Sequence, residues 1–215
     1  MEKYKAVLFD MDGVIIDTEK HLVKYWCEAA NEMGYPMKRE HALHIRSLSG
    51  NLAAEYLKKE VDSGFDYERV RERRKELMSA ELKRVDIEMK RGIKELLSEL
   101  KKRGIRRAVC TATDYPRTKG YLTEIGLFDS FDKIICASMV KHGKPAPDIY
   151  LYACGELSLD PAECLAAEDS PNGILSAYSA GCSVVMIPDL TPPTEEDRSR
   201  IIGAAETLID VVKYL

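Results

Sequence analysis

The sequence predicts an α/β fold: a Rossmann-like parallel sheet with helices on both faces, plus an inserted all-helical cap domain. Short apolar runs alternate with helical stretches from residue 92 onward, and one apolar run near the N-terminus stands apart from the others. The roughly 70 residues between them show helical periodicity alone. A length of 215 residues is above the usual single-domain size but short for two full domains, which fits one core with an insertion.

The first expected element is a buried strand over residues 5–9, because this apolar run ends abruptly at Asp10. Beyond it, Leu22, Trp26 and Ala30 recur at helical spacing, and no strand pattern follows until about residue 89. Two more helical stretches are predicted near 52–59 and 67–84. We therefore expect a helical cap domain over residues 17–88, inserted into a core domain made of residues 1–16 and 89–215.

The second half of the chain alternates helices and strands, as expected for a parallel sheet covered on both faces. Strands are predicted over 107–111, 133–136, 164–168 and 182–187, and helices over 93–103 and after Pro116, Pro147 and Pro171. Ser170 before Pro171 is typical of a helix N-terminus, with serine as the cap and proline in the first turn. The carboxyl ends of these strands should meet the end of the first strand at one crevice.

Composition and charge exclude several classes of protein. The apolar share of 45% is ordinary for a globular protein, the net charge is −4, and no apolar run approaches the about 18 residues that a membrane helix needs. The first residues lack a signal-peptide pattern, and the six cysteines include no pair at two-residue spacing. We expect a cytoplasmic monomer with reduced thiols and with neither nucleic acid nor membrane as a partner.

Polar side chains follow the predicted strands. In chain order they are Asp10 with Asp12, Thr111 with Thr113 and Asp114, Lys144 in the loop after the third strand, and Glu168 with Asp169. Two carboxylates about 4 Å apart repel by roughly 4 kcal/mol at an effective dielectric of about 20, so such a cluster requires a cation. Oxygen ligands favour a hard cation such as Mg²⁺, and an opposing lysine suits an anion. The arrangement therefore indicates phosphoryl transfer.

Residues 9–19 (FDMDGVIIDTE), Thr111, residues 144–145 and residues 168–173 (EDSPNG) resemble the four motifs of the haloacid dehalogenase-like superfamily. The helical insertion is similar to the subclass I cap of its phosphatase and β-phosphoglucomutase branch. Dehalogenases of the superfamily lack the second aspartate, which here is Asp12. The resemblance implies a Mg²⁺-dependent phosphatase that acts on a small soluble phosphomonoester, such as a sugar phosphate, through an aspartyl-phosphate.

The resemblance also implies roles for the matching residues. Asp10 is the implied nucleophile, and Asp12 is the implied general acid and base. Thr111 and Lys144 are expected to bind the phosphoryl oxygens and to balance their charge. The implied metal ligands are Asp10, Asp169, the backbone carbonyl of Asp12 and Glu168, the last either as a direct ligand or in a supporting role.

Substrate contacts outside these motifs are candidates only. Arg46 lies in a polar loop between predicted cap helices, and in proteins that the chain resembles this loop reaches toward the substrate. Thr113 and Asp114 are further candidates. Trp26 is expected in the cap core, and the basic residues of the run 69–75 alternate with glutamates as on a solvated helix surface.

Two other functions stay open. A β-phosphoglucomutase-like isomerase shares the same core, but such sequences carry a histidine at the position of Leu22, and His21 lies one residue earlier. A non-catalytic module that binds a phosphorylated ligand is less expected, since it has no use for Asp12 as acid and base.

Overall fold

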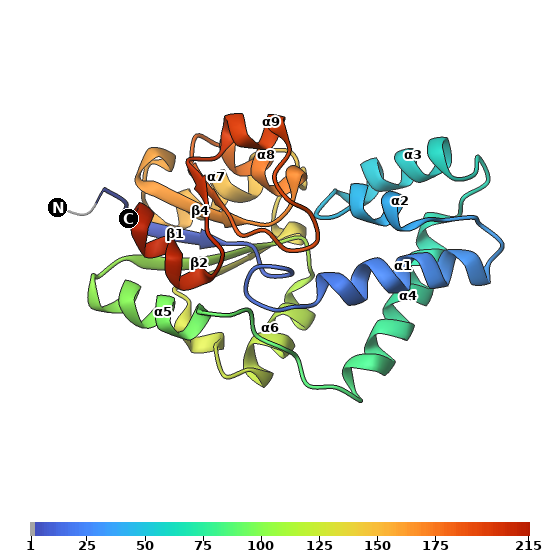
Figure 1. The fold of residues 1–215 in the computed structure, drawn as a ribbon, viewed down its shortest axis with the longest axis horizontal. Helices are drawn as coiled ribbons and strands as arrows, with labels where there is room; N and C mark the ends of the chain where they lie inside the picture. Colours follow the sequence, from blue (N-terminus) through green and yellow to red (C-terminus); the bar gives the residue numbers. More distant parts are fainter. Residues whose placement is uncertain (1–2) are drawn as a thin grey trace.

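A six-stranded parallel sheet forms the centre of the computed structural model, which describes residues 3–215 (Figure 1). The strand order is β3-β2-β1-β4-β5-β6. The strands are β1 (Ala6–Phe9), β2 (Arg106–Thr111), β3 (Lys133–Cys136), β4 (Cys164–Glu168), β5 (Ser183–Met186) and β6 (Gly203–Ala204). The predicted α/β fold is confirmed, with one strand, β6, that the sequence did not indicate. Residues 1 and 2 of the expected core segment 1–16 lie outside the described residues.

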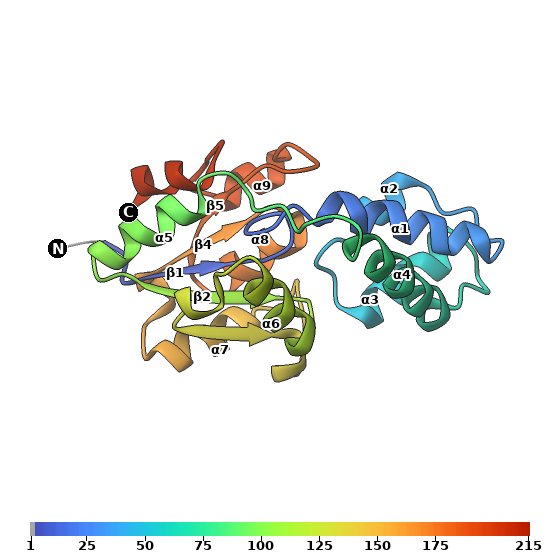
Figure 2. The same cartoon turned by 90° about the horizontal axis from the view of Figure 1, so that it is seen from below.

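Helices cover both faces of the sheet because alternate side chains of each strand point to opposite faces. Val7 and Phe9 of β1 pack with α5 (Ile93–Lys102) and α6 (Tyr115–Glu124), whereas Ala6 and Leu8 pack with α7 (Asp148–Leu157) and α8 (Pro171–Ser179). Figure 2 shows α5 and α7 on opposite sides of the sheet. The helix α9 (Glu195–Arg200) and the short 3₁₀ segments Phe128–Ser130, Ala137–Met139, Pro161–Glu163 and Leu208–Tyr214 complete the core.

Ser170 begins α8 as predicted, since its side chain accepts a hydrogen bond from the N–H of Gly173 at 3.1 Å. Gly173 also lets the helix approach the sheet closely, because a Cβ there would lie 2.0 Å from an oxygen of Glu168. The first turn of α8 is thereby fixed against the end of β4. No helix within residues 3–215 is long and apolar enough to cross a membrane.

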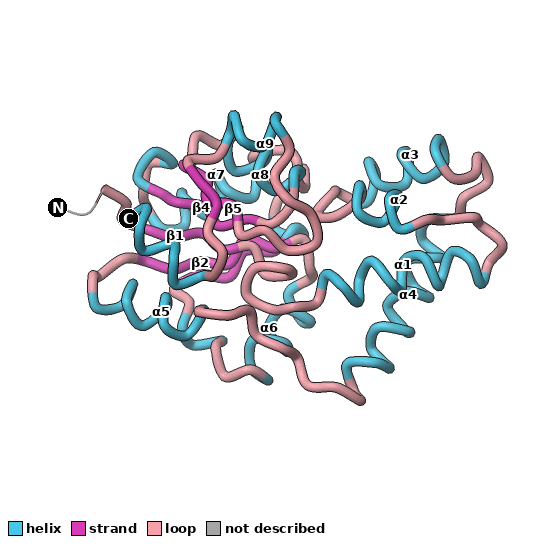
Figure 3. The backbone as a smooth tube through the Cα atoms, viewed as in Figure 1, coloured by secondary structure: helices cyan, strands magenta, loops and turns pink. Residues whose placement is uncertain are grey.

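The segment between β1 and α5 is helical and lies beyond the carboxyl ends of the strands (Figure 3). It contains α1 (Glu19–Glu32), α2 (Arg39–His44), α3 (Gly50–Glu60) and α4 (Tyr67–Leu82). These helices have their own buried cluster, centred on Trp26, Leu57, Phe65 and Val70. The short α2 falls where no helix was predicted, because six residues are too few to show a helical period.

The chain crosses between the core and the helical segment at two adjacent points. The N–H of Asp17 donates to the carbonyl of Glu88 at 2.8 Å, and the N–H of Lys90 donates to the carbonyl of Ile15 at 2.9 Å. The Lys20 ammonium contacts both Asp17 and Glu88, at 2.6 and 2.7 Å. The two crossing strands therefore form one short antiparallel connection.

Candidate active site

The loop after β1 carries Asp10 and Asp12 to the carboxyl edge of the sheet. β1 is buried between β2 and β4, and the N–H of Asp10 donates to the carbonyl of Ala167 at 3.0 Å. Gly13 then turns the chain with a φ of +84°, and a Cβ at this position would lie 2.5 Å from an oxygen of Asp169. Glycine is required because the left-handed backbone and the close approach to Asp169 both exclude a side chain.

Lys144 lies between the carboxylates of Asp10 and Glu168. Its Nζ donates to Asp10 Oδ1 and to Glu168 Oε1, both at 2.6 Å, and all three side chains are buried. The Tyr150 hydroxyl donates to the same oxygen of Glu168 at 2.5 Å. Burial alone lowers the pKa of Lys144, but the two carboxylates together raise it above its usual value. The lysine is therefore a cation throughout the physiological pH range.

Three carboxylates form a compact acidic cluster, since Asp10, Glu168 and Asp169 offer oxygens that lie within 4.8 Å of one another. Glu168 Oε2 and Asp169 Oδ1 are buried and have no hydrogen-bond partner in the part of the chain that the structure describes. Burial, together with the neighbouring carboxylates, raises the pKa of Asp10 to about 7 and that of Asp169 well above its usual value, although Lys144 and Arg46 oppose the two shifts. Unpaired buried oxygens beside like charges fit a hard divalent cation such as Mg²⁺.

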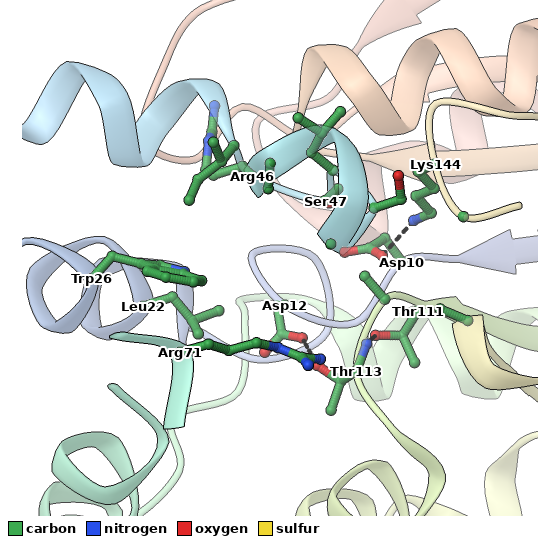
Figure 4. A pocket seen from close by; sticks show the side chains of 18 of the residues that line it. Asp10, Asp12, Leu22, Trp26, Arg46, Ser47, Arg71, Thr111, Thr113 and Lys144 are labelled. Atoms are coloured by element: carbon green, nitrogen blue, oxygen red, sulfur yellow. Dashed lines mark hydrogen bonds and ion pairs between the residues drawn. The ribbon is translucent and has the colours of Figure 1, made fainter. Parts of the chain in front are cut away.

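The carboxylate of Asp12 faces away from this acidic cluster and is held by two hydroxyl groups. Thr18 Oγ1 donates to Oδ1 at 2.5 Å, and Thr113 Oγ1 donates to Oδ2 at 2.8 Å. Figure 4 shows Asp12 and Thr113 side by side, below the pair of Asp10 and Lys144. In this orientation Asp12 is expected to contact the metal only through its backbone carbonyl. The carboxylate of Asp12 is held in the cavity, where a reactant can exchange a proton with it.

Thr111 ends β2 and lines the same cavity as Thr113, whose N–H donates to Thr111 Oγ1 at 3.0 Å. Asp114 does not reach the cavity. Its carboxylate caps α6 and accepts hydrogen bonds from the N–H of Arg117 at 3.2 Å and from its Nε at 2.8 Å. The structure thus brings Thr113 to the site and leaves Asp114 out, because the capping geometry turns the aspartate toward its helix.

The site opens into a cavity of about 280 Å³ between the core and the helical segment. From α1, the side chains of Glu19, Leu22 and Trp26 line it, and Trp26 also packs in the core of the helical segment as predicted. His21, the histidine next to Leu22, is not among the described residues that line the cavity. At the position where a mutase is expected to carry a histidine, this chain therefore presents the apolar side chain of Leu22 to the cavity.

Arg46 enters the site from the loop between α2 and α3. Its Nη1 lies 3.1 Å from Asp169 Oδ2, its Nη2 donates to Thr191 Oγ1 at 2.6 Å, and the residue is 5% exposed. Asn172 holds the loop by donating to the carbonyls of His44 and Arg46 at 3.0 and 2.8 Å. The expected contact of Arg46 with a phosphate or sugar stays a prediction, and the structure shows an ion pair with a candidate metal ligand.

Sequence analysis did not assign roles to Thr18, Glu19 and Tyr150, which also belong to the site. Thr18 and Glu19 stand within the first motif, so their place in the sequence was the available signal. Glu19 is 4% exposed, and burial beside Asp169 and Asp12 raises its pKa well above the usual value. Tyr150 lies on α7, where only the fold brings it to Glu168.

The basic run 69–75 is solvated only in part. Arg73 pairs with Glu76 and Lys75 pairs with Glu72, as the alternating charges predicted, and Arg73 also pairs with Glu32 of α1. Arg71 and Arg74, however, line the cavity. The prediction of a solvated surface is wrong for Arg74, which is buried, whereas Arg71 is half-buried and pairs with Glu68 as the charge pattern predicted.

Comparison with known proteins agrees with this geometry. A family model described as haloacid dehalogenase-like hydrolase matches residues 7–187. A Bacillus subtilis protein named as a phosphatase, YhcW, is 35% identical over 187 residues, which cover 86% of this chain and 84% of that protein. The β-phosphoglucomutase of B. subtilis is 29% identical over 84% of this chain and 82% of that protein. The structure of CbbY from Rhodobacter sphaeroides in complex with phosphate has a TM-score of 0.79 and 26% identity, covering 97% of this chain and 96% of that one.

Proposed function

Because the chain belongs to the haloacid dehalogenase-like hydrolases, with named phosphatases among its relatives, we propose that it is a Mg²⁺-dependent phosphatase of small phosphomonoesters. The single observation that carries the proposal is the separation of the two aspartates. Asp10 lies against Lys144 in the acidic cluster, while Asp12 is held apart by Thr18 and Thr113. A nucleophile and a proton donor in one cavity are what ester cleavage through a covalent intermediate requires.

In the proposed reaction an oxygen of Asp10 attacks phosphorus, and the bond from phosphorus to the leaving oxygen breaks. Protonated Asp12 gives its proton to that oxygen, so the product departs as an alcohol. Asp12 then takes a proton from water as the water attacks the aspartyl-phosphate, which releases phosphate and restores Asp10. Lys144 balances the charge on the phosphoryl oxygens, and Thr111 donates a hydrogen bond to one of them.

The metal would be held by Asp10, Glu168, Asp169 and the backbone carbonyl of Asp12. Bound there, Mg²⁺ would withdraw charge from the phosphoryl oxygens and offset the repulsion between the carboxylates. The two buried oxygens without hydrogen-bond partners, Glu168 Oε2 and Asp169 Oδ1, support this site. Glu168 also anchors Lys144, so it serves the lysine whether or not it reaches the metal.

We propose that residues 17–88 form a cap that opens and closes over the site. The helical segment has its own apolar core, and the backbone enters and leaves it at the paired crossing near Ile16 and Met89. Closure would exclude bulk water and limit the substrate to a small molecule. The six free thiols suit a monomer working in the reducing cytoplasm.

Hydrolysis is favoured over mutase isomerisation because Leu22, which has no proton to exchange, lines the cavity in place of a histidine. A generic aryl phosphate, p-nitrophenyl phosphate, tests the proposed function directly. We expect turnover with Mg²⁺, no turnover in excess EDTA, and recovery when Mg²⁺ is restored. Full activity in exhaustively chelated protein, or no hydrolysis of any phosphate ester with Mg²⁺ present, would overturn it.

A further inference from the structure

Three arginines line the part of the cavity that the proposed chemistry does not use: Arg71 and Arg74 of α4, and Arg117 of α6. Arg74 is the most informative of them. It is 6% exposed, its guanidinium lies 5.1 Å from the centre of the Trp26 ring, and its Nη1 lies 4.0 Å from the sulfur of Met78. Its Nε has no hydrogen-bond partner among residues 3–215.

Arg74 keeps its charge in this position. Burial, together with the nearby cations Arg117 and Arg71, lowers its pKa to about 10, so the guanidinium stays protonated at neutral pH. A buried cation without a hydrogen-bonded counter-charge is destabilising, and Asp12, whose charge acts on Arg74 from a distance, is already held by Thr18 and Thr113. The sulfur and the aromatic ring around Arg74 supply no negative charge.

Four other cations that line the cavity have carboxylate partners. Lys144 contacts Asp10 and Glu168, and Arg46 contacts Asp169. Arg117 pairs with Asp114 at 2.8 Å, and Arg71 lies 3.5 Å from Glu68, which is largely exposed. Arg71 and Arg117 thus each contact one carboxylate, and both of these carboxylates are accessible to solvent, whereas Arg74 contacts neither. This end of the cavity carries an excess of positive charge.

The position of these arginines relative to Asp12 tells which part of a substrate they would meet. Figure 4 shows the Arg71 side chain extending toward Asp12 and Thr113, with Leu22 and Trp26 nearby. Asp12 is the proposed proton donor to the leaving oxygen, so the group that departs must lie on this side. The opposite side, with Asp10 and Lys144, holds the phosphoryl group.

We propose that Arg71, Arg74 and Arg117 form a second anion-binding subsite, and that the substrate carries a second anionic group on its leaving part. A carboxylate and a second phosphate share the chemistry that guanidinium groups bind, through paired charge-assisted hydrogen bonds. The inference rests on the proposed phosphatase function, because it uses Asp12 to locate the leaving group. It narrows the substrate class to phosphomonoesters that carry a second anionic group, such as a phosphorylated sugar acid or a bisphosphate.

Matched substrate pairs test the subsite. Sorbitol 6-phosphate and 6-phosphogluconate differ by a carboxylate, fructose 6-phosphate and fructose 1,6-bisphosphate differ by a phosphate, and 2-hydroxyethyl phosphate and phosphoglycolate form a shorter pair. In at least one pair we expect the more anionic member to have a kcat/KM at least tenfold higher. The pair that shows the preference identifies the anion as carboxylate or phosphate and gives the reach of the subsite.

Two charge-removing variants on α4 assign the preference to the subsite. Arg71→Gln should bring the ratio within each pair close to one by lowering kcat/KM for the more anionic member. Arg69→Gln removes the same charge from an exposed position that does not line the cavity, so it should keep the wild-type ratio. Arg117→Gln is the second subsite variant, and thermal melting shows which variants stay folded. Arg74→Lys retains a charge at the buried position but loses the planar guanidinium, so it should weaken the preference.

Failure of the inference and failure of the proposed function are distinguishable. Hydrolysis of p-nitrophenyl phosphate with ratios near one in every pair overturns the subsite and leaves the phosphatase intact. If no ester is hydrolysed, the phosphatase proposal fails, and calorimetric binding to the Mg²⁺-loaded Asp10→Asn protein then decides the subsite. Tighter binding of the anionic member that is lost in the Asp10→Asn/Arg71→Gln protein supports it, and equal affinity overturns it. A preference that persists in both Arg71→Gln and Arg117→Gln also overturns it.

Discussion

Arg46 and Asp169 form a buried ion pair across the boundary between the helical segment and the core, with Arg46 Nη1 3.1 Å from Asp169 Oδ2. Their side chains are 3% and 0% exposed. Asp169 is also a candidate metal ligand whose second oxygen has no partner among residues 3–215. Arg46 therefore places a positive charge beside the acidic cluster, as a bound metal cation would.

Arg46→Met should destabilise the metal-free protein more than the Mg²⁺-loaded protein. Removing one partner of a buried pair costs about 3–5 kcal/mol of unfolding free energy, which for a protein of this size lowers the melting temperature by roughly 10 °C. With Mg²⁺ bound, the cation replaces part of the lost charge and the decrease should be smaller. Thermal melting in EDTA and in Mg²⁺ measures both. The Arg46→Met/Asp169→Asn protein, without either charge, should regain stability in EDTA, and equal losses under the two conditions would contradict the prediction.

Asp10→Asn should abolish turnover while the protein stays folded. The amide keeps the size of the side chain but cannot attack phosphorus, so we expect kcat to fall at least a thousandfold, about 4 kcal/mol in activation free energy. Rates with p-nitrophenyl phosphate and melting curves for both proteins give the comparison. A variant that keeps more than about a tenth of the activity would show that another residue is the nucleophile.

Metal-free protein should lose stability as the pH rises from about 4 to 7. The pKa of Asp10 is about 7 in the folded protein, because burial disfavours its charged form, and near 3.8 when the chain is unfolded. In this range the folded state binds more protons than the unfolded state, so the unfolding free energy falls with pH, by up to about 1.4 kcal/mol per pH unit for each such group. This stabilisation is fully present below the pKa that Asp10 has in the unfolded chain. It is lost as the pH rises through the pKa that Asp10 has in the folded protein.

Urea unfolding across this pH range in EDTA measures the slope. Asp10→Asn removes the contribution of Asp10 and should flatten the curve in part, since the buried carboxyl groups of Asp169 and Glu19 have raised pKa values as well. Saturating Mg²⁺ should oppose the loss, because the cation binds the ionised carboxylates. A flat profile in EDTA for the wild-type protein would show that the acidic cluster is not under electrostatic strain.

Incubation with β-glucose 1-phosphate and a trace of the 1,6-bisphosphate should yield inorganic phosphate rather than accumulate glucose 6-phosphate. Leu22 lines the cavity and cannot take part in proton exchange, so a sugar hydroxyl has no advantage over water as the acceptor of the phosphoryl group. Leu22→His is the matched variant and should raise the share of transfer to sugar. Glucose 6-phosphate appearing well ahead of phosphate in the wild-type protein would favour a mutase.

The core site could be predicted because parallel strands bring their carboxyl ends together, so residues far apart in the sequence were expected at one place. The contacts among Asp10, Lys144 and Glu168 follow from that rule. The role of Tyr150 could not be predicted, because it depends on which side of α7 faces the end of β4. The strand β6 has two residues, too few to show an alternating pattern.

The prediction for Arg74 of α4 was wrong for a different reason. Alternating charges in the run 69–75 suggested a solvated surface. Some residues of this run also belong to a pattern of buried positions at helical spacing. Tyr67, Val70, Arg74 and Met78 are the buried residues of this helix, and they follow one another at spacings of three and four. Arg74 thus occupies a position in the apolar stripe, which was the signal available in the sequence. A charged residue at such a position needs a functional explanation more than its charged neighbours do.

The paired crossing at Ile16 and Met89 makes the helical segment, in topological terms, one long hairpin loop. Its two ends are already adjacent in the core, so a short turn joining them would leave every strand in its place. Loop-closure entropy rises only with the logarithm of loop length, so the core can carry insertions of very different size at little energetic cost. Exchange of this whole segment can therefore change the substrate range while Asp10, Lys144 and Asp169 of the core keep their places.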